Sequence, residues 1–427
     1  MAGVDLYEDL SWRGMMSEST EGLRDALAAA PVTAYIGFDP TADSLHVGSL
    51  LTVMGLARLQ QHGHSPIAIV GGGTGMIGDP SGKSQERTLQ SLEQIDANVA
   101  GIRRQLERFL DFDRPDNPAR IVNNADWLAT FDLLGFLRDT GKYFTVNYLL
   151  QKESVNRRLE SEEGISYTEF SYLLLQARDF LELFDRFHCT VQMGGSDQWG
   201  NITAGIDLVR KLRATRVHGL VWPLMTTATG TKFGKTEAGT VWLDAARTSP
   251  FRFYQFWLNT DDRDVVRYLK LFTFMPREDI DALATATAEH PERREAQRAL
   301  ARAVTALVHG DDQVQRAERA AQVLFAEDIR NAAVDDVLMV FEDAPSTELP
   351  LPADGMPLAD MLATVKLVPS KSEAMRLLKS GGVYVNNVRA TDERVRLTAA
   401  DAIGGTLFVL RKGRKDHHIV KLVVHAR

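Results

Sequence analysis

The stretch Val32 to Ser49, VTAYIGFDPTADSLHVGS, defines the first structural unit of this chain. It begins with a short apolar run that ends in an Asp-Pro-Thr turn, which is typical of a buried strand. The residues from 50 to 61 then show helical spacing up to Gly63, and a second apolar run over 66–70 predicts another strand. This strand–helix–strand order predicts a parallel sheet.

The rest of the chain divides by its periodicity into further regions. Strands are predicted over 119–122 and 190–193, with a long helix over 169–184 between them. After Pro250 the patterns are almost entirely helical. The fold class we expect is α/β, with a Rossmann-like parallel-sheet catalytic domain (1–247), an all-α domain (248–324), a linker (325–356) and a small α+β domain (357–427).

Length and composition exclude several classes of protein. A chain of 427 residues is too long for one core, and 44% hydrophobic with 25% charged residues is typical of a soluble globular protein. No apolar run approaches the roughly 20 residues of a membrane span, and residues 1–10 show no export signal. The single cysteine, Cys189, excludes an intramolecular disulfide and is expected to be buried. We therefore expect a cytoplasmic protein without a membrane partner.

Charge is unevenly distributed along the chain. Residues 359–427 carry 13 Lys and Arg against 6 Asp and Glu, in a chain whose net charge is −8. A basic C-terminal module on an otherwise acidic protein suggests that a polyanionic partner binds to the C-terminal region. A solvated basic surface explains the same charge equally well.

Two glycine-rich strings imitate nucleotide-binding motifs. Residues 73–78 read G-x-G-x-x-G after a predicted strand, but Pro80 stands where a dinucleotide-binding helix would need a backbone donor. Gly82-Lys83-Ser84 resembles the end of a P-loop, but Ile77 occupies the position of its first glycine. We reject both motifs, and with them an NAD-binding protein.

Two other segments suit phosphate chemistry. His46 stands just before a predicted helix, whose N-terminus offers unpaired N–H groups and a positive dipole end. Lys232 and Lys235 flank Gly234 in a Thr- and Gly-rich loop, which we expect to be mobile and able to close over a pyrophosphate. Taken separately, His46 reads as a loop residue and the lysines as a solvated loop.

Together these segments resemble the bacterial tyrosyl-tRNA synthetases, a class I aminoacyl-tRNA synthetase family, over essentially the whole chain. The resemblance rests on five segments in family order. Tyr35 to Gly48 matches the "HIGH" signature and Lys232 to Thr236 the "KMSKS" signature. The other three are Gly78 to Lys83, Gly194 to Asn201, and an S4-like pair formed by Ser370 to Ala374 with Gly382 to Asn386.

The resemblance implies a reaction and its residues. Tyrosine attacks the α-phosphate of ATP, pyrophosphate leaves, and tyrosine then moves to the 3′-terminal ribose of tRNA(Tyr). An ionised carboxylate needs no general base, so catalysis rests on positioning and charge stabilisation. The implied catalytic residues are Thr41, His46, Lys83, Arg87, Lys232, Lys235 and Thr236. The implied tyrosine-binding residues are Tyr35, Asp79, Tyr172, Gln176, Asp179 and Gln192, and those for ATP and adenylate are Gly37, Asp39, Gly48, Ser49, Gly195, Asp197, Gln198 and Lys235.

Spacing supports one part of this assignment. Tyr172, Gln176 and Asp179 are four and three residues apart, so one helix face presents all three. Core packing explains Tyr172 equally well, but Gln176 and Asp179 fit a core poorly.

The chain departs from the family at two positions. Ser49 replaces the second histidine of the signature, where we expect it to cap the helix, and Ile36 replaces a polar ribose contact. Both changes concern ATP affinity rather than the reaction type.

Two alternatives and several partners complete the expectation. A tryptophan-specific sister enzyme shares the fold, but Asp179 opposite Tyr35 favours a phenol. A non-catalytic RNA-binding protein on the same scaffold would not need Lys83, Lys232 or Lys235.

The family implies a homodimer, and ATP as a substrate with Mg²⁺. We expect no resident metal, no organic cofactor and no DNA partner. Deletion of the residues after Gly355 is expected to spare adenylate formation and abolish tRNA charging.

Overall fold

The computed structural model describes residues 5–81, 89–160, 164–231, 233–236, 239–413 and 416–423. The chain folds into two compact units, one formed by residues 1–249 and 255–308 and the other by residues 250–254 and 309–427. No helix in the described ranges is long and apolar enough to cross a membrane.

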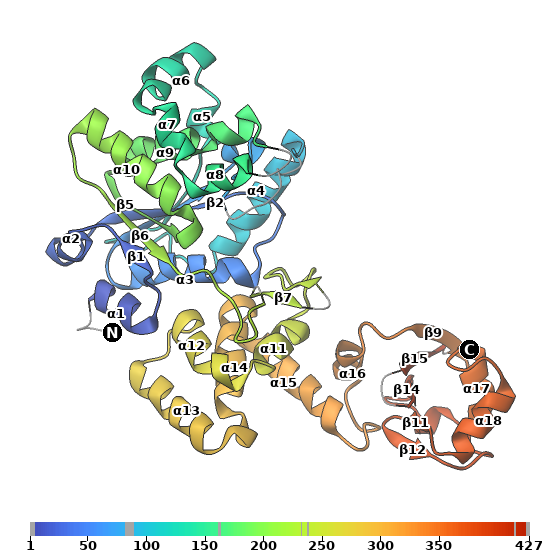
Figure 1. The fold of residues 1–427 in the computed structure, drawn as a ribbon. Helices are drawn as coiled ribbons and strands as arrows, with labels where there is room; N and C mark the ends of the chain where they lie inside the picture. Colours follow the sequence, from blue (N-terminus) through green and yellow to red (C-terminus); the bar gives the residue numbers. More distant parts are fainter. Residues whose placement is uncertain are drawn as a thin grey trace. The chain divides into compact units, whose positions relative to one another are not determined.

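A six-stranded sheet forms the centre of the first unit (Figure 1). The strand order is β1-β6-β5-β2-β3-β4, and every neighbouring pair is parallel except β1 with β6. The strand order reverses between β2 and β5, so their carboxyl ends flank the crevice where ligands bind in such sheets. The strands are β1 (Glu18–Ser19), β2 (Thr33–Phe38), β3 (Ser65–Val70), β4 (Arg120–Asn123), β5 (Cys189–Gly195) and β6 (His218–Trp222).

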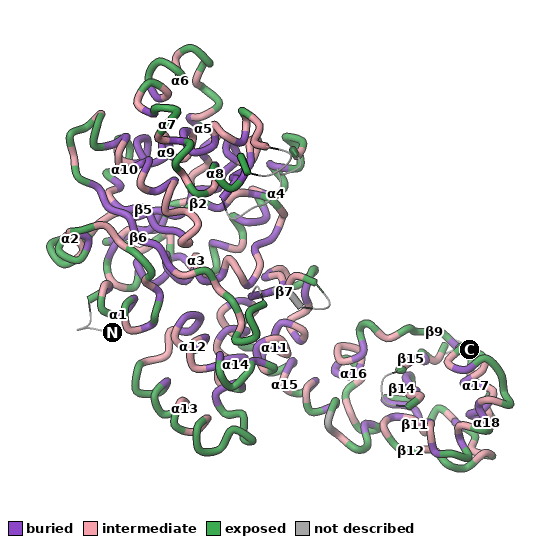
Figure 2. The backbone as a smooth tube through the Cα atoms, viewed as in Figure 1, coloured by how far each residue is buried: buried purple, intermediate pink, exposed green. Residues whose placement is uncertain are grey.

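Helices cover the sheet and bury its inner strands, as Figure 2 shows. Helix α3 packs against β2 and β3, α4 against β3, and α9 and α10 against β5. Strands buried on both faces read as continuous apolar runs, which is why 66–70 could be predicted. These helices are α3 (Val47–Gln61), α4 (Leu92–Leu106), α9 (Tyr167–Phe187) and α10 (Trp199–Arg213). The shorter ones are α1 (Leu6–Arg13), α2 (Leu23–Ala29), α5 (Ala125–Leu128), α6 (Leu133–Asp139), α7 (Val146–Leu150) and α8 (Glu153–Leu159).

The helical middle of the chain agrees with its sequence pattern. The almost entirely helical pattern that was expected after Pro250 is confirmed over residues 250–325. An aromatic cluster from α11 and α12 fills this region around Phe233. The helices are α11 (Pro250–Leu258), α12 (Asp262–Phe272), α13 (Arg277–Glu289), α14 (Glu295–His309) and α15 (Asp311–Phe325).

The segment 325–356, expected as a linker, contains regular structure. It carries α16 (Val334–Val340) and β9 (Ser346–Pro350), and β9 pairs in parallel with β15 (Asp416–Val423). Leu349 is buried in the C-terminal core, so this strand belongs to the C-terminal sheet. That expectation was wrong because three prolines interrupt the segment and its strand partner lies far away in sequence.

The C-terminal sheet has five strands in the order β12-β11-β14-β15-β9, with two helices packed beside it. The region contains both helices and strands, as expected for an α+β domain. The remaining elements of this region are β10 (Met356–Pro357), α17 (Leu358–Thr364), α18 (Lys371–Lys379), β11 (Val383–Val385), β12 (Val388–Ala390), β13 (Arg396–Leu397) and β14 (Leu407–Lys412).

Candidate active site

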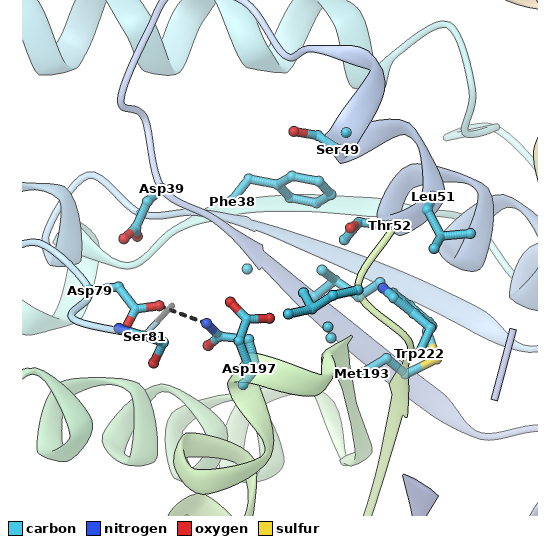
Figure 3. A pocket seen from close by; sticks show the side chains of 18 of the residues that line it. Phe38, Asp39, Ser49, Leu51, Thr52, Asp79, Ser81, Met193, Asp197 and Trp222 are labelled. Carbon is cyan, nitrogen blue, oxygen red and sulfur yellow. Dashed lines mark hydrogen bonds between the residues drawn. The ribbon is translucent and has the colours of Figure 1, made fainter. Parts of the chain in front are cut away.

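A cavity of about 620 Å³ opens at the carboxyl ends of β2 and β5, within the first unit (Figure 3). Most of the predicted site residues line it. They are Tyr35, Gly37, Asp39, Thr41, His46, Gly48, Ser49, Asp79, Tyr172, Gln176, Asp179, Gln192, Gly195, Asp197 and Gln198. Lys83, Arg87 and Lys232 lie outside the described residues, and Lys235 and Thr236 are described as backbone only, in β7 (Lys235–Thr236), which pairs with β8 (Gly239–Thr240).

The carboxylate of Asp179 marks one end of the cavity. It is buried and accepts hydrogen bonds from the Trp127 indole N–H (2.7 Å) and from the Asn124 amide (2.9 Å). Burial raises the pKa of Asp179 to about 7, although both hydrogen bonds act in the opposite direction. The hydroxyl of Tyr35 is also buried, and it has no hydrogen-bond partner in the structure. A buried acceptor beside an unsatisfied hydroxyl suits a polar, phenol-like group of a ligand.

Asp39 forms a second polar centre at the end of β2. Its carboxylate accepts hydrogen bonds from the hydroxyls of Tyr172 (3.0 Å) and Thr74 (2.9 Å). Burial and the nearby Asp39 charge raise the pKa of Tyr172, so this hydroxyl keeps its proton and acts as a donor. The Asn124 amide donates to the Thr74 hydroxyl at 2.9 Å, which links this centre to Asp179.

A network of side-chain amides lines the wall near Asp79. The Gln198 amide donates to the Asp79 carboxylate at 2.7 Å, the contact drawn as a dashed line in Figure 3. Asn201 in turn donates to Gln176 at 2.9 Å, and the Gln176 amide donates to Gln198 at 3.2 Å. These bonds fix the orientation of three amides around one carboxylate, and a cationic ligand group would be favoured there.

The turn before α3 brings His46 to the cavity. His46 is the N-cap residue of α3 with extended backbone, and its side chain makes no capping hydrogen bond. A Cβ on Gly48 would come 2.8 Å from Cε1 of His46, so only glycine leaves room for the ring there. Ser49 lies inside the first turn, and its N–H donates to the His46 carbonyl. The expectation that Ser49 caps the helix was therefore wrong.

The second signature segment lies against the first. Gly234 has a left-handed backbone with φ +80°, and a Cβ there would come 2.6 Å from Cγ2 of Val47. The N–H of Val241 donates to the Gly234 carbonyl, and the N–H of Val47 donates to the Val241 carbonyl. Phe233 is buried and stacks on Phe272 at 5.3 Å. The backbone of this segment is thereby held beside the N-terminus of α3.

Several polar residues of the cavity were missed by the sequence reasoning. Thr74 follows β3 and Asn124 follows β4, so the rule that ligands bind at the carboxyl ends of parallel strands could have identified both. Ser81 also lines the cavity, whereas Trp127 and Asn201 lie outside the lining and hydrogen-bond to residues that form it. No local sequence pattern indicates these contacts.

The described residues contain no cluster of three His, Cys, Asp or Glu side chains that could hold a metal ion. The aspartates of the cavity are Asp39, Asp79, Asp179 and Asp197.

Comparison with known proteins finds two family descriptions that match successive parts of the chain. Residues 27–326 match the family described as tRNA synthetases class I (W and Y), and residues 336–420 match the tyrosine–tRNA ligase SYY-like C-terminal domain. A tyrosine–tRNA ligase of Roseiflexus castenholzii is 55% identical and one of Geobacillus stearothermophilus is 50% identical, each across 98% of this chain and at least 99% of the relative.

Solved structures share the fold. A C-terminally truncated mitochondrial tyrosyl-tRNA synthetase of Aspergillus nidulans has a TM-score of 0.70 and 32% identity, covering 76% of this chain and 95% of that one. A tryptophanyl-tRNA synthetase of Encephalitozoon cuniculi has a TM-score of 0.52 at 13% identity, covering 73% of this chain and 87% of that one. The second similarity concerns the fold alone.

Proposed function

Because the chain belongs to the bacterial tyrosyl-tRNA synthetase family and is a tyrosine–tRNA ligase, we propose that its cavity holds tyrosine and ATP during the first step of that reaction. A tyrosine carboxylate oxygen bonds to the α-phosphorus of ATP as the bond to pyrophosphate breaks. The tyrosyl group then passes to the 3′-terminal ribose of tRNA(Tyr), and AMP leaves.

The observation that carries this assignment is the pair of buried groups at Tyr35 and Asp179. In this proposal the phenol of the substrate donates to Asp179 and accepts from the unsatisfied Tyr35 hydroxyl. Phenylalanine would leave the Tyr35 hydroxyl buried and unpaired, at a cost of about 1–3 kcal/mol, and would offer no donor to Asp179 beyond Trp127 and Asn124. An indole N–H could reach only the acceptor, which favours tyrosine over tryptophan.

The remaining polar groups divide between the substrate ammonium and the adenylate. We assign the ammonium to Asp79, Tyr172 and Gln176, because the carboxylate and the amides oriented around it suit a cation. The ribose and the adjoining substrate are assigned to residues at the ends of β2 and β5 and after them. These are Gly37, Asp39, Gly195, Asp197 and Gln198, whereas Gln192, within β5, is assigned to tyrosine.

The phosphates are assigned to the two signature segments. Thr41 and His46 meet the γ-phosphate side beside the N-terminus of α3, where backbone N–H groups and the helix dipole favour anions. Gly48 and Ser49 allow close approach to the nucleotide. Lys83, Arg87, Lys232, Lys235 and Thr236 supply cations and a hydroxyl for the departing pyrophosphate. Mg²⁺ enters with ATP, since it is usually bound through substrate phosphates and few carboxylates.

The C-terminal module is assigned to tRNA. Its net charge of +7 over 359–427 suits the phosphate backbone. We propose 1–247 and 248–324 as the first two domains, and we extend the C-terminal module from 357–427 to include β9. We place the protein in the cytoplasm, in line with its one buried, free thiol.

A homodimer is the assembly we propose. Helices α6 and α7 expose large apolar side chains, among them Leu133 and Leu134, which are 69% and 76% exposed. Apolar side chains gathered in this way are commonly covered by a partner, and here we propose a second copy. Light scattering should give the mass of two chains, and Leu134→Glu should shift it toward one.

The assay that tests the function is ATP–pyrophosphate exchange without tRNA, run with tyrosine, phenylalanine and tryptophan. Exchange with tyrosine alone is expected. Exchange with tryptophan would move the specificity assignment to the sister enzyme. Absence of exchange with all three, while tRNA still binds, would favour a non-catalytic RNA-binding protein.

A further inference from the structure

One face of α4 contacts the loop that joins β2 to α3. The face consists of Asn98, Gly101 and Gln105, which are three and four residues apart and therefore lie on the same side of the helix. The loop, residues 39–46, carries Thr41 and ends at His46. None of the three α4 residues lines the cavity.

Asn98 holds the beginning of this loop through its backbone. The side chain is 1% exposed, and its amide donates to the Pro40 carbonyl at 2.9 Å and to the Gln90 side-chain oxygen at 3.2 Å. Gln90 donates in turn to the Thr41 carbonyl at 3.1 Å. The Asn98 oxygen accepts from Gln94 at 2.9 Å, which fixes the orientation of its amide. The Asn98 amide therefore binds the Pro40 carbonyl directly and is linked to the Thr41 carbonyl through Gln90. These two carbonyls lie on either side of the Thr41 N–H.

Gly101 and Gln105 hold the second half of the loop. A Cβ on Gly101 would come 2.0 Å from the Asp43 carbonyl oxygen, so only glycine allows this approach of helix and loop. The Gln105 oxygen accepts from the Leu45 N–H at 2.8 Å, and its amide donates to the Ser44 hydroxyl at 2.9 Å. Both hydrogen-bonding groups of this one side chain are thus used on the residues directly before His46.

We propose that this face of α4 positions the phosphate-binding loop, with Asn98 and Gln105 as positioning residues that act through Thr41 and His46. The inference rests on the proposed role of Thr41 and His46 at the ATP phosphates. Packing alone would be served by apolar side chains, whereas Asn98 is a buried polar side chain directed at loop backbone. Hydrogen bonds to the backbone set the height and tilt of the loop, and a misplacement of about 1 Å can cost on the order of a hundredfold in rate.

The test replaces the two amides by apolar side chains of similar size, Asn98→Leu and Gln105→Met. In single-turnover adenylate formation we expect kcat/KM for ATP to fall by about tenfold to a hundredfold. The tyrosine Kd, measured by equilibrium dialysis, should change by less than about twofold because the phenol site is built on other elements. Asp96→Ala, an exposed change on the same helix, is the matched control and should behave as wild type.

A double-mutant cycle with Thr41→Ala separates positioning from general damage. If Asn98 acts through Thr41, Asn98→Leu should cost much less in the Thr41→Ala background than alone. Equal costs in both backgrounds would overturn the inference while leaving the role of Thr41 intact. A Thr41→Ala variant with wild-type ATP kinetics would overturn both the positioning inference and the proposed role of Thr41 at the ATP phosphates.

Two further variants keep the inference testable if Asn98→Leu does not fold. Gln90→Met removes only the hydrogen bonds of a partly exposed side chain and should lower kcat/KM for ATP in the same selective way. Gly101→Ala favours the helix by about 1 kcal/mol but pushes on the Asp43 carbonyl. Slower adenylate formation with an unchanged tyrosine Kd supports positioning, and wild-type kinetics for both variants would overturn it.

Discussion

The indole N–H of Trp127 donates a 2.7 Å hydrogen bond to the buried carboxylate of Asp179. This bond and the one from Asn124 favour the ionised form, yet burial dominates and raises the pKa of Asp179 to about 7. The carboxyl group therefore changes charge within the physiological range. It is also the group that we expect to accept a hydrogen bond from the substrate phenol. The same carboxyl group therefore affects both the stability of the protein and its binding of tyrosine.

The first prediction concerns the pH dependence of stability. In the unfolded chain an aspartate titrates near pH ~4, so between about pH 4 and pH 7 the native state binds more protons than the unfolded state. The stability that Asp179 contributes at low pH is thus lost as the pH rises to about 7. Asp179→Asn removes this titration, so its free energy of unfolding relative to wild type should increase from pH 5 to pH 7 and then level off.

Urea unfolding at several pH values measures this difference. The residues around position 179 are the same in both proteins, so other titrations largely cancel. If the free energy of unfolding of Asp179→Asn relative to wild type stays constant between pH 5 and pH 8, the Asp179 pKa is not raised.

The second prediction concerns two buried tyrosines with opposite surroundings. The Tyr35 hydroxyl has no partner in the structure, whereas the Tyr172 hydroxyl donates to Asp39. Tyr35→Phe should not lower the melting temperature, because it removes an unsatisfied polar group, but it should weaken tyrosine binding by about 1 kcal/mol. Tyr172→Phe should lower the free energy of unfolding by about 1 kcal/mol. Thermal melts and equilibrium dialysis measure both, and destabilisation by Tyr35→Phe alone would contradict the assignment.

Short apolar runs made the parallel sheet predictable, and the family resemblance implied most of the residues that line the cavity. Tyr35 lies within a strand that is predicted directly from its apolar run, and Asp39 directly follows that strand, at the edge where the carboxyl ends of parallel strands meet. Trp127 was missed because its partner, Asp179, is more than fifty residues away in sequence. No helical or strand period encodes such a contact.

A contact between residues distant in sequence also explains why the segment 325–356 was wrongly expected to be a linker. Proline cannot donate to a strand ladder, so Pro350 made the strand over 346–350 read as irregular. In the structure this strand lies at the edge of its sheet, where Pro350 is tolerated as the last residue and pairs with Val423. Edge position is a property of the assembled sheet and is not visible locally.

The third prediction concerns the contact between the two signature segments. Gly234→Ala places a Cβ 2.6 Å from Cγ2 of Val47 and forces an L-residue to φ +80°, a conformation that costs about 1–2 kcal/mol. We expect adenylate formation to slow by about tenfold or more, with the tyrosine Kd unchanged. Gly230→Ala is the matched control, since Gly230 has φ +81° but nothing within 4 Å of its Cβ position. Equal losses in the two variants would attribute the effect to backbone strain alone.

The fourth prediction concerns where the C-terminal module can be removed. A chain ending at Gly355 keeps β9 without β15 and exposes Leu349, so it should be aggregation-prone. A chain ending at Ala326 avoids this. We expect it to retain pyrophosphate exchange near the wild-type rate, while tRNA charging falls at least about tenfold because the basic segment is gone. Exchange and charging assays on purified 1–326 measure this. Loss of exchange would show that the catalytic fold needs residues beyond 326, and undiminished charging would remove the case for tRNA binding by the module.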